Sequence, residues 1–131
     1  MKMKTAKFVV VLSMLGLLAS CAQMAPFEAR NADTHRVAEN ARTYFDHDTV
    51  ARQYEIIAKE LLAEVEKKKK LLDNYEDKSY LYGKRAQDMR SHTSALLRKY
   101  EKAVEEAVKQ AALHQKISSE LARDVHTKRV N

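Results

Sequence analysis

The chain has 131 residues and a formal net charge of +6, and it contains two glycines, one proline and no tryptophan. Residues 34–129 are dominated by alanine, leucine, glutamate, lysine, glutamine and arginine, which are strong helix formers. Because no segment alternates polar and apolar residues with a period of two, this composition excludes a β-sheet protein and predicts a single all-helical domain.

The first 20 residues have the pattern of an export signal. Lys2, Lys4 and Lys7 give a positively charged start, and residues 8–18 form an almost wholly apolar run. This run is too short for a membrane-spanning helix, which needs about 20 residues. A basic start, a short apolar run and small residues before a cut are typical of a signal peptide, so we expect residues 1–20 to be removed.

The apolar run ends in Leu18-Ala19-Ser20-Cys21, and Cys21 is the only cysteine of the chain. This motif resembles the lipobox of bacterial lipoproteins, in which a leucine and two small residues precede an invariant cysteine. The resemblance implies cleavage before Cys21, a diacylglycerol on its thiol and a fatty acid such as palmitate on its amine. Several acyl chains give a stable membrane anchor. An ordinary secretory signal with an accidental cysteine is the alternative.

The residue after Cys21 is Ala22 rather than an aspartate. An aspartate at this position usually retains Gram-negative lipoproteins in the inner membrane, so the resemblance implies the outer membrane and its periplasmic face. The inner (cell) membrane is the alternative. From Cys21 onward the chain has 21 basic and 18 acidic residues. So small a positive charge, in an exported protein, excludes nucleic acid as a partner.

Residues 21–33 are expected to form a lipidated tether without helical periodicity, and residues 34–75 a long helix. The apolar positions of this helix recur every seven residues, as in a coiled coil. These positions are Val37, Tyr44, Ala51, Ala58, Val65 and Leu72. The predicted helix could be interrupted at residues 46–49, where Asp48 is an acceptable N-cap. We favour a continuous helix, with a break near Asp48 as the alternative.

Residues 76–83 combine Gly83 with poor helix formers and are predicted to form a turn. A second helix is expected over residues 84–126, followed by a tail at 127–131. Nearly equal arms of about 42 residues around one turn predict an antiparallel helical hairpin roughly 60 Å long. Because two helices cannot enclose a core, we expect two chains to form a four-helix bundle or the hairpin to dock on a partner. A break near Asp48 would instead close a three-helix bundle.

Two of the five histidines are expected to meet in this hairpin. If the turn is centred at residues 80–81, His47 faces His114 across the two helices. At about 100° per residue, both histidines lie within the apolar stripes of their helices. Facing imidazoles can bind Zn²⁺ or Cu²⁺, and Asp46 and Asp48 flank His47 as additional ligands.

Other interpretations of this pair remain open. Facing imidazoles could clamp a haem, although no haem-attachment motif is present. Protonation of both imidazoles below about pH 6 could drive the helices apart. We favour packing residues that are partly buried and satisfied by the hydroxyl group of Tyr44 or Tyr54. His35 and His126 fall on the same register, but we expect this second pair to be exposed.

Two surface features add further candidates. Tyr75, Tyr80 and Tyr82 cluster at the turn, where we expect them to cap the open end of the bundle, with an interaction site as the alternative. The four lysines of residues 67–70 span about 300° of a helix. We interpret them as a solvated helix end, and contact with anionic lipid is the alternative.

The sequence contains no phosphate-binding loop, nucleophile motif or HExxH motif, so we expect no enzyme. Residues 47–122, with Tyr80-Leu81-Tyr82-Gly83, resemble small helical proteins and lipoproteins of Gram-negative bacteria, a resemblance that implies no activity. We predict a lipid-anchored, periplasm-facing protein with a structural or protein-interaction role in the cell envelope. The alternative is an envelope protein that binds zinc or copper through His47 and His114.

Overall fold

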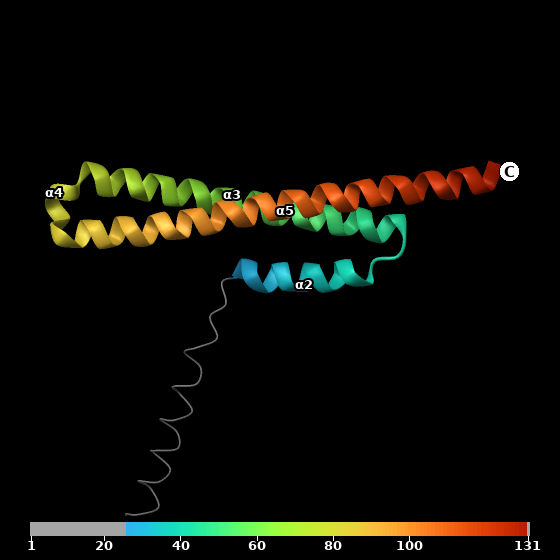
Figure 1. Cartoon of the computed structure of the whole chain (residues 1–131), viewed down its shortest axis with the longest axis horizontal. Helices are drawn as coiled ribbons and strands as arrows, with labels where there is room; N and C mark the ends of the chain where they lie inside the picture. The colour runs from blue at the N-terminus through green and yellow to red at the C-terminus, as the bar shows by residue number, and fades with distance from the viewer. Residues whose placement is uncertain (1–25, 131) are drawn as a thin grey trace, which may run out of the picture.

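The structure, a computed structural model, describes residues 26–130 (Figure 1). In this range it contains no strand and four helices, namely α2 (Pro26–Asn40), α3 (Tyr44–Asp77), α4 (Ser79–Tyr82) and α5 (Lys84–Val130). The expected signal peptide at residues 1–20, the lipidation site Cys21 and the start of the tether lie outside the described residues. Within residues 26–130, no helix is both long enough and apolar enough to cross a bilayer.

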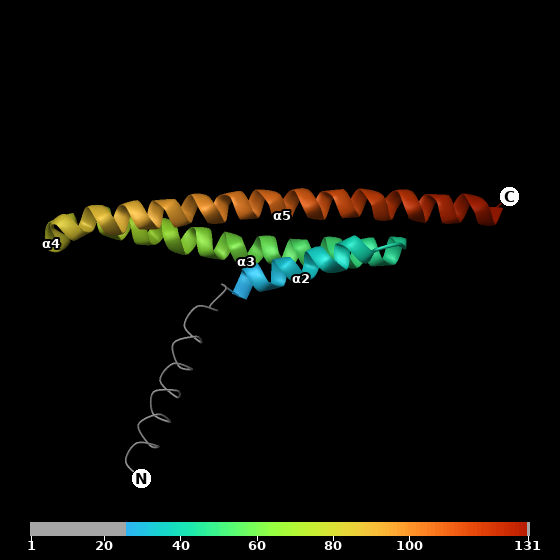
Figure 2. The ribbon, with the colours of Figure 1, turned by 60° about the horizontal axis from the view of Figure 1, so that its bottom comes forward.

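The helices α3 and α5 form the body of the molecule. They run antiparallel, are connected through the single turn of α4 and lie side by side in both views (Figure 1, Figure 2). With 47 residues, α5 is about 70 Å long at 1.5 Å per residue, and it extends past the start of α3. The predicted all-helical fold with a long antiparallel hairpin is therefore confirmed.

The core lies between α3 and α5. On α3, Val50 is fully buried, and Tyr54 and Leu61 are each 2% exposed. Their spacing of four and seven residues places them on one helix face. The facing part of α5 contributes the small residues Ala107 and Ala111 to the same cluster. Large side chains from α3 thus fill the space that small side chains on α5 leave open.

The continuous helix expected over residues 34–75 is wrong, because the chain leaves the helical conformation between α2 and α3. Thr43 provides the signal that starts α3. Its hydroxyl group accepts a hydrogen bond from the backbone N–H of Asp46, and the Asp46 carboxylate accepts one from the N–H of Thr43. This capping box satisfies two otherwise unpaired groups of the helix N-terminus. The break therefore precedes the alternative position near Asp48.

The helix α2 folds back along α3 and covers one side of the hairpin (Figure 2). The ring of Phe27 packs on that of Tyr100 of α5, with 5.4 Å between the centroids. The Glu28 carboxylate accepts a hydrogen bond from Nζ of Lys99 at 2.6 Å. Beside α2 the hairpin is thus a three-helix arrangement, which was the alternative topology.

The ends of the helices also differ from expectation. The part of the expected tether (residues 21–33) that the structure describes is helical, from Pro26 onward. The tail expected at residues 127–131 belongs to α5 as far as Val130. No glycine or proline follows Gly83, so nothing in the sequence forces α5 to stop earlier.

The turn expected at residues 76–83 is a tight corner that contains α4. Gly83 ends it with a φ of 52° and a ψ of −133°. Glycine adopts such a positive φ without the steric cost that a Cβ atom imposes. This one residue therefore redirects the chain into α5.

Candidate functional site

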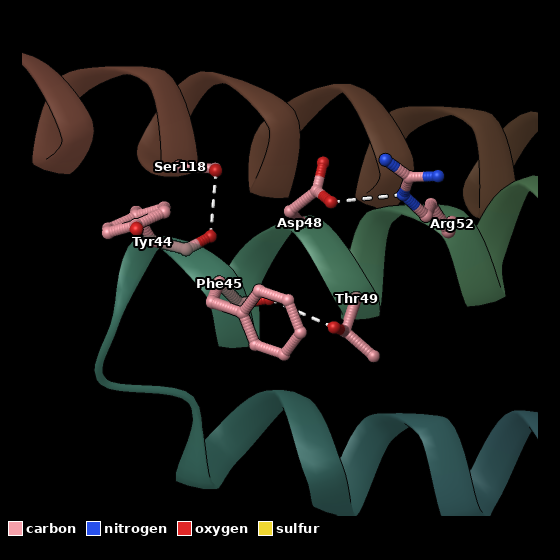
Figure 3. Close-up of polar contacts among 6 residues, drawn as sticks. All are labelled: Tyr44, Phe45, Asp48, Thr49, Arg52 and Ser118. Atoms are coloured by element: carbon pink, nitrogen blue, oxygen red, sulfur yellow. Dashed lines mark hydrogen bonds and ion pairs between the residues drawn. The ribbon is translucent and has the colours of Figure 1, made fainter.

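His47 and His114 lie opposite each other between α3 and α5, close to the start of α3. The cap at Thr43 fixes where α3 begins and hence which side chains face α5. His114 is only 7% exposed. One turn further along α5, the hydroxyl group of Ser118 donates a hydrogen bond to the carbonyl oxygen of Tyr44 at 2.7 Å (Figure 3). This bond fixes the register of the two helices beside the histidines.

The two imidazoles are in direct contact. The Nδ1 atoms of His47 and His114 are 2.8 Å apart, and the ring centroids are 5.1 Å apart with an interplanar angle of 25°. The ring of Tyr54 also stacks on that of His114, with 6.1 Å between the centroids. The sequence prediction that His47 faces His114 is therefore confirmed, and Tyr54 supplies a stacking partner rather than the expected hydroxyl contact.

The hydrogen bond between the two rings requires one donor and one acceptor. One Nδ1 atom must carry a proton and the other must present its lone pair, so the neutral rings adopt different tautomers. Burial lowers the pKa of His114, and a charge on His47 lowers it further. A first proton on the pair keeps an N–H donor facing a lone pair, whereas a second proton would place two donors face to face.

The two aspartates expected as additional ligands do not join the histidines. The Asp46 carboxylate accepts hydrogen bonds from the backbone N–H groups of Thr43 and Arg42, and these bonds lower the pKa of Asp46. The Asp48 carboxylate accepts a hydrogen bond from Nε of Arg52 at 3.0 Å (Figure 3). Both carboxylates are thus engaged in hydrogen bonds near the start of α3 and do not join His47 and His114 in one site.

The fit of a metal ion to this site can be judged from its donor set. Within residues 26–130, no group of three or more histidine, cysteine, aspartate or glutamate side chains converges. His47 and His114 supply two of the four ligands that zinc usually takes. Two nitrogens on a tetrahedral zinc at about 2.0–2.1 Å lie roughly 3.3 Å apart, so a bound ion would have to replace the 2.8 Å hydrogen bond. Water or a second chain would complete the coordination shell.

Two of the three tyrosines expected at the turn, Tyr75 and Tyr80, can be placed, and they differ in exposure. Tyr80 is 79% exposed, so the expectation that it caps the end of the bundle is wrong. Tyr75 is half-buried, and the side chain of Tyr82 lies outside what the structure describes. Sequence reasoning missed Leu81, which is 64% exposed beside Tyr80. Its apolar character at the centre of the predicted turn was the available signal.

The second histidine pair does not form. His35 lies on α2, where its ring is 3.5 Å from the carboxylate of Glu39. His126 lies on the part of α5 beyond the start of α3, and both histidines are exposed. The antiparallel register therefore predicted contact correctly only for His47 and His114, which both lie inside the apolar stripes of their helices.

Comparison with known proteins does not extend this picture. No protein-family model matches the chain, and neither curated proteins nor solved structures give a match. The functional argument therefore depends on the residues themselves.

Proposed function

We propose that this protein is a lipid-anchored helical protein of the bacterial envelope that acts by binding rather than by catalysis. The observation that carries the proposal is the sequence Leu18-Ala19-Ser20-Cys21 at the end of a short apolar run with a basic start. A binding role is supported by the exposed side chains of Tyr80 and Leu81 at one end of the hairpin.

The lipid anchor is tested by growing cells that express the full chain with an alkyne analogue of palmitate. We expect label on the native protein, none on the Cys21→Ser variant and full label on Ser20→Gly, which keeps a small residue before the cut. Label that persists in Cys21→Ser, or its absence from the native chain, would contradict the anchor. Separation of the two membranes then tests location, because Ala22→Asp should move the protein from the outer to the inner membrane.

Metal binding is a second candidate function, favoured by one observation. Two imidazole nitrogens lie 2.8 Å apart on different helices, where a small movement of the side chains would direct both lone pairs at one ion. Calorimetric titration of the protein with Zn²⁺ and with Cu²⁺ tests it. We expect stoichiometric binding that is lost in His47→Ala and in His114→Ala but kept in His92→Ala, an exposed histidine on α5. Binding that ignores the first two substitutions would exclude this site.

A further inference from the structure

One face of α3 points away from α5 and, from Phe45 to Asn74, carries basic but no acidic side chains. Its positions follow one another at intervals of three or four residues, which keeps them on one side of a helix. Ala63, for example, lies about 200° around the helix from the buried Leu61. We call this face the outward stripe. It consists of Phe45, Thr49, Arg52, Ile56, Lys59, Ala63, Lys67, Lys70 and Asn74.

The outward stripe differs from the matching face of α5. Along α5 the corresponding positions mix the two signs. They are Lys84, Asp88, Ser91, Ala95, Arg98, Lys102, Glu105, Lys109, Leu113, Lys116, Glu120, Asp124 and Thr127. Four acids and five bases are thus mixed on α5, whereas the stripe from Phe45 to Asn74 has four bases and no acid. The next position of this face is Asp77, the last residue of α3. The run of lysines at residues 67–70 contributes only its first and last members to the stripe.

Neighbouring acids do not cancel the charge that the stripe presents. Lys67 pairs with Glu64, but the lysine side chain is 69% exposed and the glutamate 35%. Arg52 pairs with Asp48 in the same way, with exposures of 74% and 32%. In each pair the base is the more exposed partner. The basic side chains therefore remain accessible to an approaching surface.

The stripe also exposes apolar side chains. Phe45 is 68% exposed and Ile56 52% exposed. Val37 of the adjoining α2 is 45% exposed, and it lines one hollow with Phe45 and another with Ile56. Figure 3 shows Phe45 and Thr49 on the side of α3 that faces α2. Basic side chains around exposed apolar ones are the composition of surfaces that lie in the interfacial layer of a membrane.

The chain enters the fold beside this stripe. Phe27, in the first turn of α2, lines a hollow together with Ala63 and Lys67. Pro26 follows Cys21 by only five positions, and five extended residues span at most about 17 Å. A lipid on Cys21 would therefore hold the bilayer surface close to the middle of the stripe.

We propose that the outward stripe docks on the anionic headgroups of the bilayer that holds the lipidated Cys21, so that the hairpin lies along the membrane with α5 away from it. The proposal rests on the lipid anchor proposed above. Anionic lipids attract basic residues near the surface, and salt screens this attraction. The chain thus has two points of attachment, a covalent lipid and a basic helix face.

The test uses the lipidated full chain in vesicles, with a fluorophore on Ala63→Cys in the stripe or on Ala95→Cys in the outward face of α5. The vesicles contain phosphatidylcholine alone or mixed with phosphatidylglycerol, together with a quencher attached near the lipid headgroup. We expect stronger quenching at residue 63 than at residue 95, only in the anionic vesicles, and loss of this difference at high salt. Lys59→Gln, Lys67→Gln and Lys70→Gln together should abolish the difference.

The matched control combines Lys102→Gln, Lys109→Gln and Lys116→Gln on α5, which removes the same charge from the other face and should leave the difference intact. Equal quenching at both labels in vesicles that carry the protein would overturn the orientation and leave the stripe free for an acidic protein. A difference that persists without phosphatidylglycerol would overturn the anionic headgroup as its ligand. Failure of the protein to float with vesicles would overturn the anchor itself, and the orientation with it.

Discussion

The hairpin has two halves that are built differently. In the three-helix half (residues 26–64 and 100–118), α2 covers the α3–α5 pair, and large side chains such as Tyr54 and Leu61 are buried. In the two-helix half (residues 65–99), the buried side chains among the described residues are those of Val65, Ala86 and Thr93. The apolar stripe of the sequence continues into this half, but beyond Val65 its next member, Leu72, is only half-buried.

The difference shows what a third helix contributes. Two helices in contact shield only a narrow strip between them, so large side chains on that strip keep one flank in water. A third helix covers one of those flanks. We therefore expect most of the stability to reside in the three-helix half, and the two-helix half to open first.

The largest expected effect compares one substitution in the two halves. Leu61→Ala removes a side chain that is 2% exposed, and we expect a loss of about 2–5 kcal/mol in the free energy of unfolding. Leu72→Ala is the matched control in the two-helix half, where the same truncation removes a half-buried side chain. Urea unfolding of both variants measures the difference. Equal losses would mean that the halves are equally well packed.

The next effect addresses the corner of the two-helix half. Gly83→Ala places a Cβ atom on a residue with a φ of 52°, although no atom beyond the adjacent residues lies within 4 Å of that Cβ. The cost is therefore backbone strain, of the order of 1–3 kcal/mol. Hydrogen exchange should become faster over residues 65–99 but not over residues 44–61. The neighbouring Lys84→Ala should change neither, and uniform acceleration would contradict separate opening of the halves.

A smaller effect concerns the start of α3 in the three-helix half. Thr43→Ala removes the hydroxyl group of the capping box and should cost about 1 kcal/mol. Thr49→Ala is the control, because its hydroxyl group bonds the carbonyl oxygen of Phe45 within the helix and caps nothing (Figure 3). Thermal unfolding of both variants distinguishes them. If Thr49→Ala were as damaging as Thr43→Ala, the cap would not be what starts the helix.

The smallest effect is a dependence on pH. Because the pKa of His114 is lowered in the folded protein, the unfolded chain takes up its proton at a higher pH than the folded chain does. Stability should therefore stay constant above the ordinary imidazole pKa of about 6.5 and decrease as the pH falls below it. Calorimetry should give a lower Tm at pH 5 than at pH 7.5. His114→Gln should reduce this decrease and His126→Gln should not, while a Tm that does not change would refute the assignment.

Periodicity predicted the parts of the fold that repeat. Helical spacing of apolar residues predicted the antiparallel contact of two long helices, and one turn centre was enough to place His47 opposite His114. The break between α2 and α3 was missed because it depends on a single local signal, the reciprocal bonds of Thr43 and Asp46. That signal lies inside an unbroken apolar stripe, which argued for a continuous helix.

The surroundings of the histidines could not be predicted in the same way. Asp46 and Asp48 are close to His47 in sequence, which made them candidate ligands, but nearby hydrogen bonds to the backbone and to Arg52 determine where they point. The contact between Phe27 and Tyr100 spans most of the chain and depends on the direction in which α2 leaves the break. Sequence spacing carries no information about that direction.

The reversal of α2 also has a mechanical consequence. A force applied to residue 26 through the proposed anchor would act on the first turn of α2. The contacts of Phe27 and Glu28 would then break before those nearer Ala41, one after another. The 15 residues of α2 are about 22 Å long as a helix and about 50 Å when extended. Detachment and unfolding of α2 would therefore lengthen the segment between the proposed anchor and α3, while α3 and α5 stay paired. Single-molecule stretching between residue 26 and the tip should show this release at lower force than hairpin rupture, and one simultaneous rupture would exclude it.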